Sequence, residues 1–129
     1  MLSVFRHHAV RIPLTRLSST VTAAPTLYLV TAPDCSDSGA LSRRLSVRPT
    51  HFERANPLHE RGVIQYAGAT LDDEGKMNGS ILVLRAHTLD DTRRCIEEDI
   101  YWEENIWDRE KLTIVPFRQA LPNTPVVKS

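Results

Sequence analysis

Short apolar segments, separated by polar stretches that favour turns, recur along the chain and predict four β-strands. They cover residues 27–32, 63–69, 80–86 and 112–117. Asn78 and Gly79 close the polar stretch before the third segment and form a dipeptide that favours the turn of a β-hairpin. Pro116 has no backbone N–H to donate, so we expect the last strand to lie at an edge of the sheet.

Two segments between these strands predict helices. Pro49 is well placed as the first residue of a helix over residues 49–61, which Gly62 would end. Thr88 and Asp91 match a capping box at the start of a second helix. The apolar stripe of that helix comprises Leu89, Thr92, Ile96 and Ile100. The order strand–helix–strand–strand–helix–strand predicts an α+β, ferredoxin-like βαββαβ antiparallel sheet with both helices on one face.

The third strand is apolar on both of its faces, because four apolar residues follow one another at positions 81–84. A sheet covered by helices on one side alternates apolar and polar residues, so a second layer is expected on the other side. In so short a chain we expect that layer to be a second copy, which makes the protein a homodimer. The alternative is a central strand with one or two tolerated exposed apolar residues.

Composition limits the class of protein. The chain has 129 residues, 41% of them hydrophobic and 25% charged, which fits a single globular domain. Its 16 basic residues balance its 16 acidic ones, and no apolar run is long enough to span a bilayer. We therefore expect neither nucleic acid nor membrane as a partner. Cys35 and Cys95 fit neither a metal motif nor a disulfide framework.

The beginning of the chain differs from the rest, because the first acidic residue is Asp34. The preceding stretch contains Arg6, Arg11 and Arg16 among many hydroxyl residues, a composition typical of a mitochondrial presequence. The alternative is a disordered basic tail, since the arginines do not share one helical face and Pro13 interrupts the helix.

This composition suggests three segments. We interpret residues 1–24 as a mitochondrial targeting segment, residues 25–120 as the folded domain and residues 121–129 as a flexible tail. The expected location is the mitochondrial matrix, or the cytoplasm if the first segment is not a presequence.

His51 is the first candidate for chemistry. On the predicted helix it shares one face with Ala55 and Leu58, whereas the charged residues cluster on the opposite face. A sheet-facing imidazole titrates near neutrality and can pass a proton in either direction. The alternative is a structural histidine held by a hydrogen bond.

Carboxylates near the end of the second helix are candidate partners for this histidine. They are Glu97, Glu98, Asp99, Glu103 and Glu104. The alternative is a solvated acidic face, and acids without well-spaced His or Cys residues would hold only a hard cation weakly. Phosphate-binding, nucleophile-elbow and CxxC motifs are all missing, so we expect no cofactor and no metal.

From residue 28 to about residue 120 the chain resembles the YCII-related domain family. The resemblance depends on Arg48, Pro49 and His51 followed by Gly62, and on Asp99 with Tyr101. It implies a dimeric α+β barrel with a His–Asp pair, His51 and Asp99, in a cleft. It also implies proton-transfer reactions on small cyclic or aromatic molecules.

Two positions depart from the family pattern, in ways that affect how Asp99 is presented. Ile100 replaces a proline, and Asn105 stands where a glycine is common.

Two functions are consistent with these residues. The first is a small acid–base enzyme, an isomerase, lyase or hydrolase acting on a small organic molecule, in which His51 moves the proton and Asp99 sets its tautomer. Arg44 and Arg48 would hold an anionic group of the substrate, and Tyr101 would line its pocket. The second is a non-catalytic module that binds a metabolite or a protein.

Overall fold

The computed structural model describes residues 24–121. Its elements in chain order are β1 (Thr26–Pro33), α2 (Ala40–Glu60), β2 (Ile64–Leu71), β3 (Met77–Ala86), α3 (Leu89–Glu97), α4 (Ile100–Glu103) and β4 (Thr113–Phe117). Apart from one residue each, the expected targeting segment and the expected tail lie outside the described residues.

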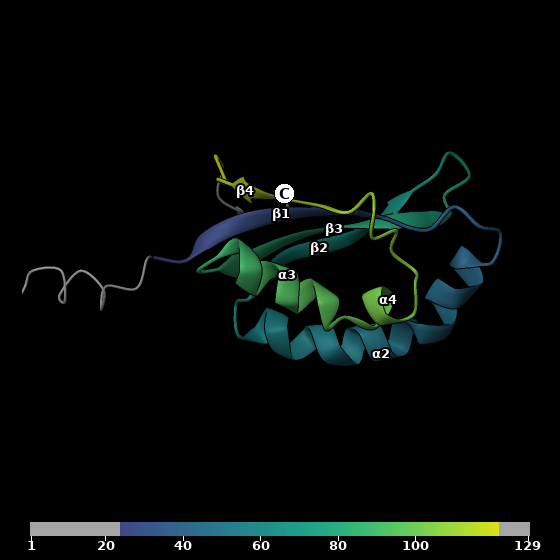
Figure 1. Ribbon diagram of the computed structural model, residues 1–129, viewed down its shortest axis with the longest axis horizontal. Coiled ribbons are helices and arrows are strands. Elements are labelled where there is room, and N and C mark those ends of the chain that lie inside the picture. Colours follow the sequence, from purple (N-terminus) through teal and green to yellow (C-terminus); the bar gives the residue numbers. More distant parts are fainter. Residues whose placement is uncertain (1–23, 122–129) are drawn as a thin grey trace, which may run out of the picture.

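The four strands form one antiparallel sheet in the order β2-β3-β1-β4. Helices α2, α3 and α4 all lie against the same face of this sheet (Figure 1). The predicted α+β, βαββαβ fold is therefore confirmed. Strand β4 pairs with β1 alone, so Pro116 occupies an edge strand as predicted.

The hydrophobic core lies between the sheet and the helices. Alternate side chains of β1 and β3 point into it, and Val30, Leu82 and Leu84 are almost completely buried. Ile96 of α3 and Trp107, in the segment after α4, complete this layer. The core thus fixes which face of each strand the helices cover.

The opposite face of the sheet carries apolar side chains that no described residue covers. Tyr66 is 63% exposed, Val115 47% and Phe117 37%. This arrangement agrees with the two-faced apolar pattern of the third strand. Within residues 24–121, no helix is both long and apolar enough to cross a membrane.

The first helix is longer than predicted. Helix α2 begins at Ala40, so the prediction that Pro49 starts it was wrong; Pro49 and Pro57 both lie inside it. Each proline removes one amide donor and leaves a carbonyl one turn earlier without its helical partner. Those carbonyls belong to Leu45 and Glu53, two residues on the exposed side of the helix.

The turn of the β2–β3 hairpin also differs from the prediction. Asn78 and Gly79 belong to β3, and the turn instead spans residues 72–76. There the Asp72 carboxylate accepts the backbone N–H groups of Glu74 and Lys76, each at 2.9 Å. The side chain of Asp72 therefore organises this turn.

The second predicted helix is divided in two. Thr88 caps α3 as predicted, because its hydroxyl accepts the Asp91 N–H at 3.0 Å. The helix ends at Glu97, however, and the Ile100 of the predicted stripe opens the separate helix α4. Asp99 lies in the break between them, which is where a side chain can leave the helical face.

Candidate active site

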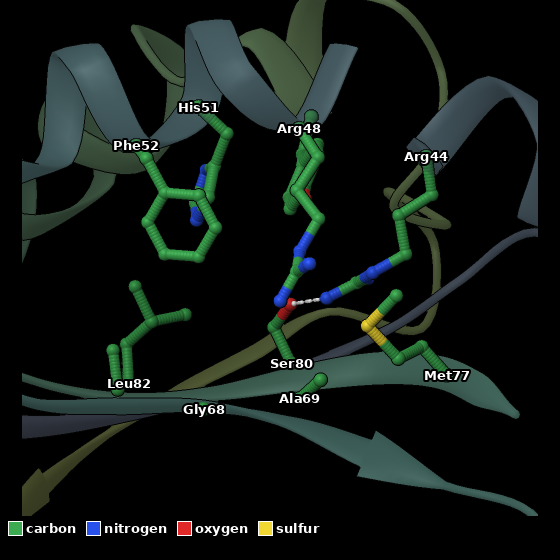
Figure 2. Close-up of a pocket in the computed structure, with 11 residues that line it drawn as sticks. Arg44, Arg48, His51, Phe52, Gly68, Ala69, Met77, Ser80 and Leu82 are labelled. Atoms are coloured by element: carbon green, nitrogen blue, oxygen red, sulfur yellow. Dashed lines mark hydrogen bonds between the residues drawn. The ribbon is translucent and has the colours of Figure 1, made fainter. Parts of the chain in front are cut away.

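A cavity of about 170 Å³ lies between α2 and the β2–β3 part of the sheet. Side chains from the helix point down toward the strands across this space (Figure 2). The lining residues are Arg44, Arg48, His51, Phe52, Ala67, Gly68, Ala69, Met77, Ser80, Leu82 and Tyr101. Polar groups from the helix therefore face a largely apolar floor.

His51 and Asp99 lie within hydrogen-bonding distance although 48 positions separate them. The His51 Nδ1 atom is 2.9 Å from Asp99 Oδ1, and the two side chains are only 15% and 13% exposed. An Nδ1–H that donates to the carboxylate leaves Nε2 as the unprotonated nitrogen of the neutral ring. Within residues 24–121 no hydrogen bond engages Nε2, and the ring lines the cavity.

The short helix α4 contacts both members of this pair, although His51 itself lies on α2. Asp99 is its N-cap, and its Oδ1 atom also accepts the Tyr101 N–H at 2.9 Å. The Tyr101 ring stacks on the His51 ring with centroids 4.0 Å apart and planes 9° from parallel. The break between α3 and α4 thus orients the carboxylate and the imidazole together.

Arg44 is tied down by buried partners. Its Nη1 atom donates to both oxygens of Asp34, at 2.7 and 3.0 Å, and its Nη2 atom donates to Ser80 Oγ at 2.9 Å. Ser80 Oγ also accepts the Trp107 indole N–H at 3.1 Å. Burial raises the pKa of Asp34 above its usual value, although the guanidinium of Arg44 opposes this effect.

Arg48 differs from Arg44, because no hydrogen bond or ion pair within the described part of the chain engages its guanidinium. Its Cζ atom lies 5.0 Å from the centroid of the Phe52 ring. The side chain extends from α2 toward the sheet, as Figure 2 shows. Arg48 therefore places an unpaired cation on the wall of the cavity.

Tyr101 also faces the cavity. Burial raises the pKa of its phenol, although Arg44 and Arg48 oppose this effect. The hydroxyl stays protonated at neutral pH, and no hydrogen bond engages it within residues 24–121. It can therefore donate a hydrogen bond to a ligand.

The structure thus gathers the predicted site residues around one cavity. Arg44, Arg48, His51 and Tyr101 line it, and Asp99 does not but is bonded to the imidazole. Among the described residues, no group of three or more His, Cys, Asp or Glu side chains is placed to hold a metal ion. The other candidate acids are exposed: Glu97, Glu98, Glu103 and Glu104.

Sequence reasoning missed the buried partners of Arg44. Two features of the sequence could have indicated them. Asp34 follows β1 directly, and Ser80 is a small polar residue inside an apolar strand. The departure at Asn105 also has a structural reason. Its φ of 54° lies in the left-handed region, which glycine and asparagine tolerate best.

The sequence profile of the YCII-related domain matches residues 26–118. The chain belongs to the YCII-related domain family. It is 33% identical over 97 residues to fusaric acid biosynthesis protein 2 of Gibberella fujikuroi, an alignment that covers 70% of this chain and 91% of that protein. It is also 34% identical over 99 residues to aspartate kinase FUB3 of Fusarium oxysporum f. sp. lycopersici; this covers 72% of the chain but only 18% of that protein.

A solved structure shares the fold of this YCII-related domain. It is 5-chloro-2-hydroxyhydroquinone dehydrochlorinase (TftG) from Burkholderia phenoliruptrix AC1100, in complex with 2,5-dihydroxybenzoquinone. The TM-score is 0.62 and the sequence identity 23%, with 73% of this chain and 95% of that chain covered. At this identity the likeness establishes the fold.

Proposed function

We propose that this YCII-related domain, residues 25–120, is a small acid–base enzyme of the isomerase, lyase or hydrolase type. The observation that carries the proposal is the His51–Asp99 pair at 2.9 Å, with the second imidazole nitrogen directed to a cavity. In this scheme Nε2 accepts a proton from a small organic substrate and returns it to another atom of the substrate or to the leaving group.

Asp99 has a supporting role in the proposed reaction. Its carboxylate keeps the proton of neutral His51 on Nδ1 and stabilises the imidazolium that forms when Nε2 is protonated. The Tyr101 N–H holds that carboxylate in place. Because the stacked Tyr101 ring restricts rotation of the imidazole, little reorientation is needed before transfer.

The remaining cavity residues bind the substrate in this proposal. Arg48 faces an anionic or developing anionic group, and Tyr101 donates a hydrogen bond from its hydroxyl. Arg44 forms the polar wall beside Ser80. The dehydrochlorinase that shares the fold was solved with a hydroxylated benzoquinone, which supports a small oxygenated ring as the class of ligand.

The test follows exchange of the ring C–H protons of 2,5-dihydroxybenzoquinone for deuterium in heavy water, measured by proton NMR. We expect the chain to accelerate exchange over buffer and His51→Asn to lower the rate about 10²–10⁴-fold. His59→Gln is the matched control, because His59 lies on the same helix and bonds the Ile64 carbonyl rather than the cavity. Equal rates for His51→Asn and the unmodified chain would refute the proposal, as would no acceleration at all.

A non-catalytic binding module is the second candidate. Its support is the aspartate kinase relative, in which the matching region is a small part of a much longer protein. Binding of the quinone that raises the melting temperature, without any exchange above buffer, would favour this function.

We also propose that the protein is a homodimer joined through the face of the sheet that carries Tyr66 and Phe117. These two side chains and Val83 line one shallow hollow on that face. A charge placed there should prevent a second copy from packing. Light scattering after gel filtration should report a dimer for the unmodified chain and a monomer for Phe117→Glu; a monomer in both cases would overturn the proposal.

We propose a mitochondrial location from the sequence composition of residues 1–24. A fluorescent protein fused to the end of the full chain should co-localise with a matrix marker. Replacing Arg6, Arg11 and Arg16 with glutamine should abolish this. A cytoplasmic signal from the unmodified fusion would show that the segment is not a presequence.

A further inference from the structure

Asp99 lies at a weakly supported point of the fold. It stands between α3 and α4, and α4 has only four residues, too few for a helix that is stable on its own. Both hydrogen bonds that its carboxylate accepts use the same oxygen, Oδ1. Asp99 also lines a second hollow, of about 250 Å³, between α2 and α3. This hollow leaves room for the carboxylate to move, so a further contact is needed to hold it against His51.

Arg54 supplies a contact of this kind. It lies three residues after His51 on α2, so the two side chains are neighbours on the surface of one helix. Its Nη1 atom donates to the backbone carbonyl of Glu98 at 3.0 Å and lies 3.1 Å from Glu103 Oε1. These acceptors belong to the residue just before Asp99 and to the last residue of α4. Arg54 therefore ties the helix that carries His51 to both sides of the break that presents Asp99.

The carbonyl of Glu98 is a suitable acceptor for a cation. Glu98 is the C-cap of α3, and the last carbonyls of a helix lack helical partners and carry the negative end of its dipole. Arginine side chains near such an end can bind these carbonyls. The Arg54 side chain is 41% exposed, so its ion pair with Glu103 adds little to the stability of the whole fold. We therefore expect its effect on the position of Asp99.

We infer that Arg54 is a positioning residue for the His51–Asp99 pair. By holding both sides of the break, it keeps the Asp99 carboxylate against Nδ1 of His51. The proton of the neutral ring then stays on Nδ1, and Nε2 is free to accept a proton. This inference rests on the proposed acid–base function and adds a residue that acts through Asp99. Arg54 does not line the cavity, so it should not affect binding of the substrate.

Nitrogen NMR of the isotopically labelled full chain tests this role, because protonated and unprotonated ring nitrogens have well-separated chemical shifts. The spectrum is recorded at the alkaline end of a pH titration, where the ring is neutral, and the His51 signals are identified by their loss in His51→Asn. We expect one tautomer in the unmodified chain, with the proton on Nδ1. Arg54→Met should move the two shifts toward each other, because both tautomers are then populated.

Two variants show whether the hydrogen bonds of Arg54 are responsible. Both contacts use one nitrogen atom, and a lysine ammonium also carries its donors on one atom, so Arg54→Lys should keep the spectrum of the unmodified chain. Arg94→Met is the matched control, because Arg94 is an exposed residue of α3 that pairs with Asp91. An unchanged His51 spectrum in Arg54→Met would overturn the inference. The same altered spectrum in Arg54→Lys, or in Arg94→Met, would overturn it too.

The kinetic test follows deuterium exchange of 2,5-dihydroxybenzoquinone at increasing concentrations of the quinone. Arg54→Met should lower the maximal rate about 10–100-fold. The concentration that gives half the maximal rate should stay the same, because Arg54 does not line the cavity. A higher half-maximal concentration with an unchanged maximal rate would contradict a positioning role.

The two measurements separate this inference from the proposed function. An altered His51 spectrum in Arg54→Met, in a chain that does not accelerate exchange, would keep Arg54 as the residue that positions the pair and remove the enzymatic function. Loss of exchange in His51→Asn, with an unchanged spectrum and rate in Arg54→Met, would keep the proton carrier and remove the role of Arg54.

Discussion

Replacing Arg44 with methionine should strongly destabilise the fold. The guanidinium of Arg44 and the carboxylate of Asp34 are bonded at 2.7 and 3.0 Å and are nearly inaccessible to water. Methionine fills much of the same space but leaves the carboxylate buried without its cation. Loss of one partner of a buried ion pair costs about 3–5 kcal/mol, a large part of the roughly 5–15 kcal/mol that stabilises a typical domain.

The loss should depend on pH in a defined direction. Burial already raises the pKa of Asp34 in the folded state, and Arg44 opposes that rise, so its removal raises the pKa further. A group with a raised folded-state pKa favours the fold when it is protonated and loses that contribution as pH rises through the folded-state pKa. Arg44→Met should therefore be most destabilised above the folded-state pKa of Asp34 and less so in acid.

Urea unfolding followed by tryptophan fluorescence measures both effects, because Trp107 is buried in the folded chain. Asp34→Asn combined with Arg44→Met removes both charges, so the double variant should recover part of the loss of the single variants. Arg93→Met serves as a control for the change in net charge. A loss below about 1 kcal/mol for Arg44→Met, or a double variant that loses the full sum of the single changes, would refute this reasoning.

Two further predictions concern the scaffold, and both are measured by the same unfolding experiment. An alanine at Gly79 would place its Cβ 2.6 Å from Thr70 Oγ1 and 3.0 Å from a β1 carbonyl, so Gly79→Ala should cost about 1–3 kcal/mol. Gly68→Ala is its control, because nothing lies within 4 Å of the added carbon; equal stabilities would contradict the steric argument. Thr88→Ala removes the cap that accepts the Asp91 N–H and should cost about 1 kcal/mol. An unchanged midpoint for Thr88→Ala would mean that water replaces the cap.

The predicted strands agree with the structure because their signals are local. Alternating apolar residues indicate which side chains face the core. Pro116 lacks a backbone N–H in any fold, so its presence alone favours an edge strand. The turn at residues 72–76 was missed because a second segment that favours a turn, Asn78–Gly79, lies only two residues further along the chain. Gly79 was assigned to a turn, but the structure uses its small size inside β3, where a Cβ would collide with the neighbouring strands.

The start of α2 illustrates a different limit. Proline at position 49 is favourable at the first position of a helix and unfavourable in its interior. The interior position is tolerated here because Pro49 and Leu45 both lie on the exposed side of the helix, so no buried hydrogen bond is lost. Exposure is a property of the folded molecule, so the residues around Pro49 could not indicate it. The local pattern therefore favoured the wrong residue as the start of the helix.

The sequence alone determined the four strands and the side of the first helix that carries His51, because each follows from the pattern within one segment. The order of these segments then predicted the class of fold. The acidic run at the end of the second predicted helix offered Asp99 as one of several candidate carboxylates, and the family resemblance singled it out together with Tyr101. Only the tertiary structure decided that Asp99 meets the imidazole at 2.9 Å and that Asp34 pairs with Arg44, whereas Arg48 has no ion-pair partner among residues 24–121. These contacts join residues far apart in the chain, so they depend on strand register and helix docking, which no local pattern specifies.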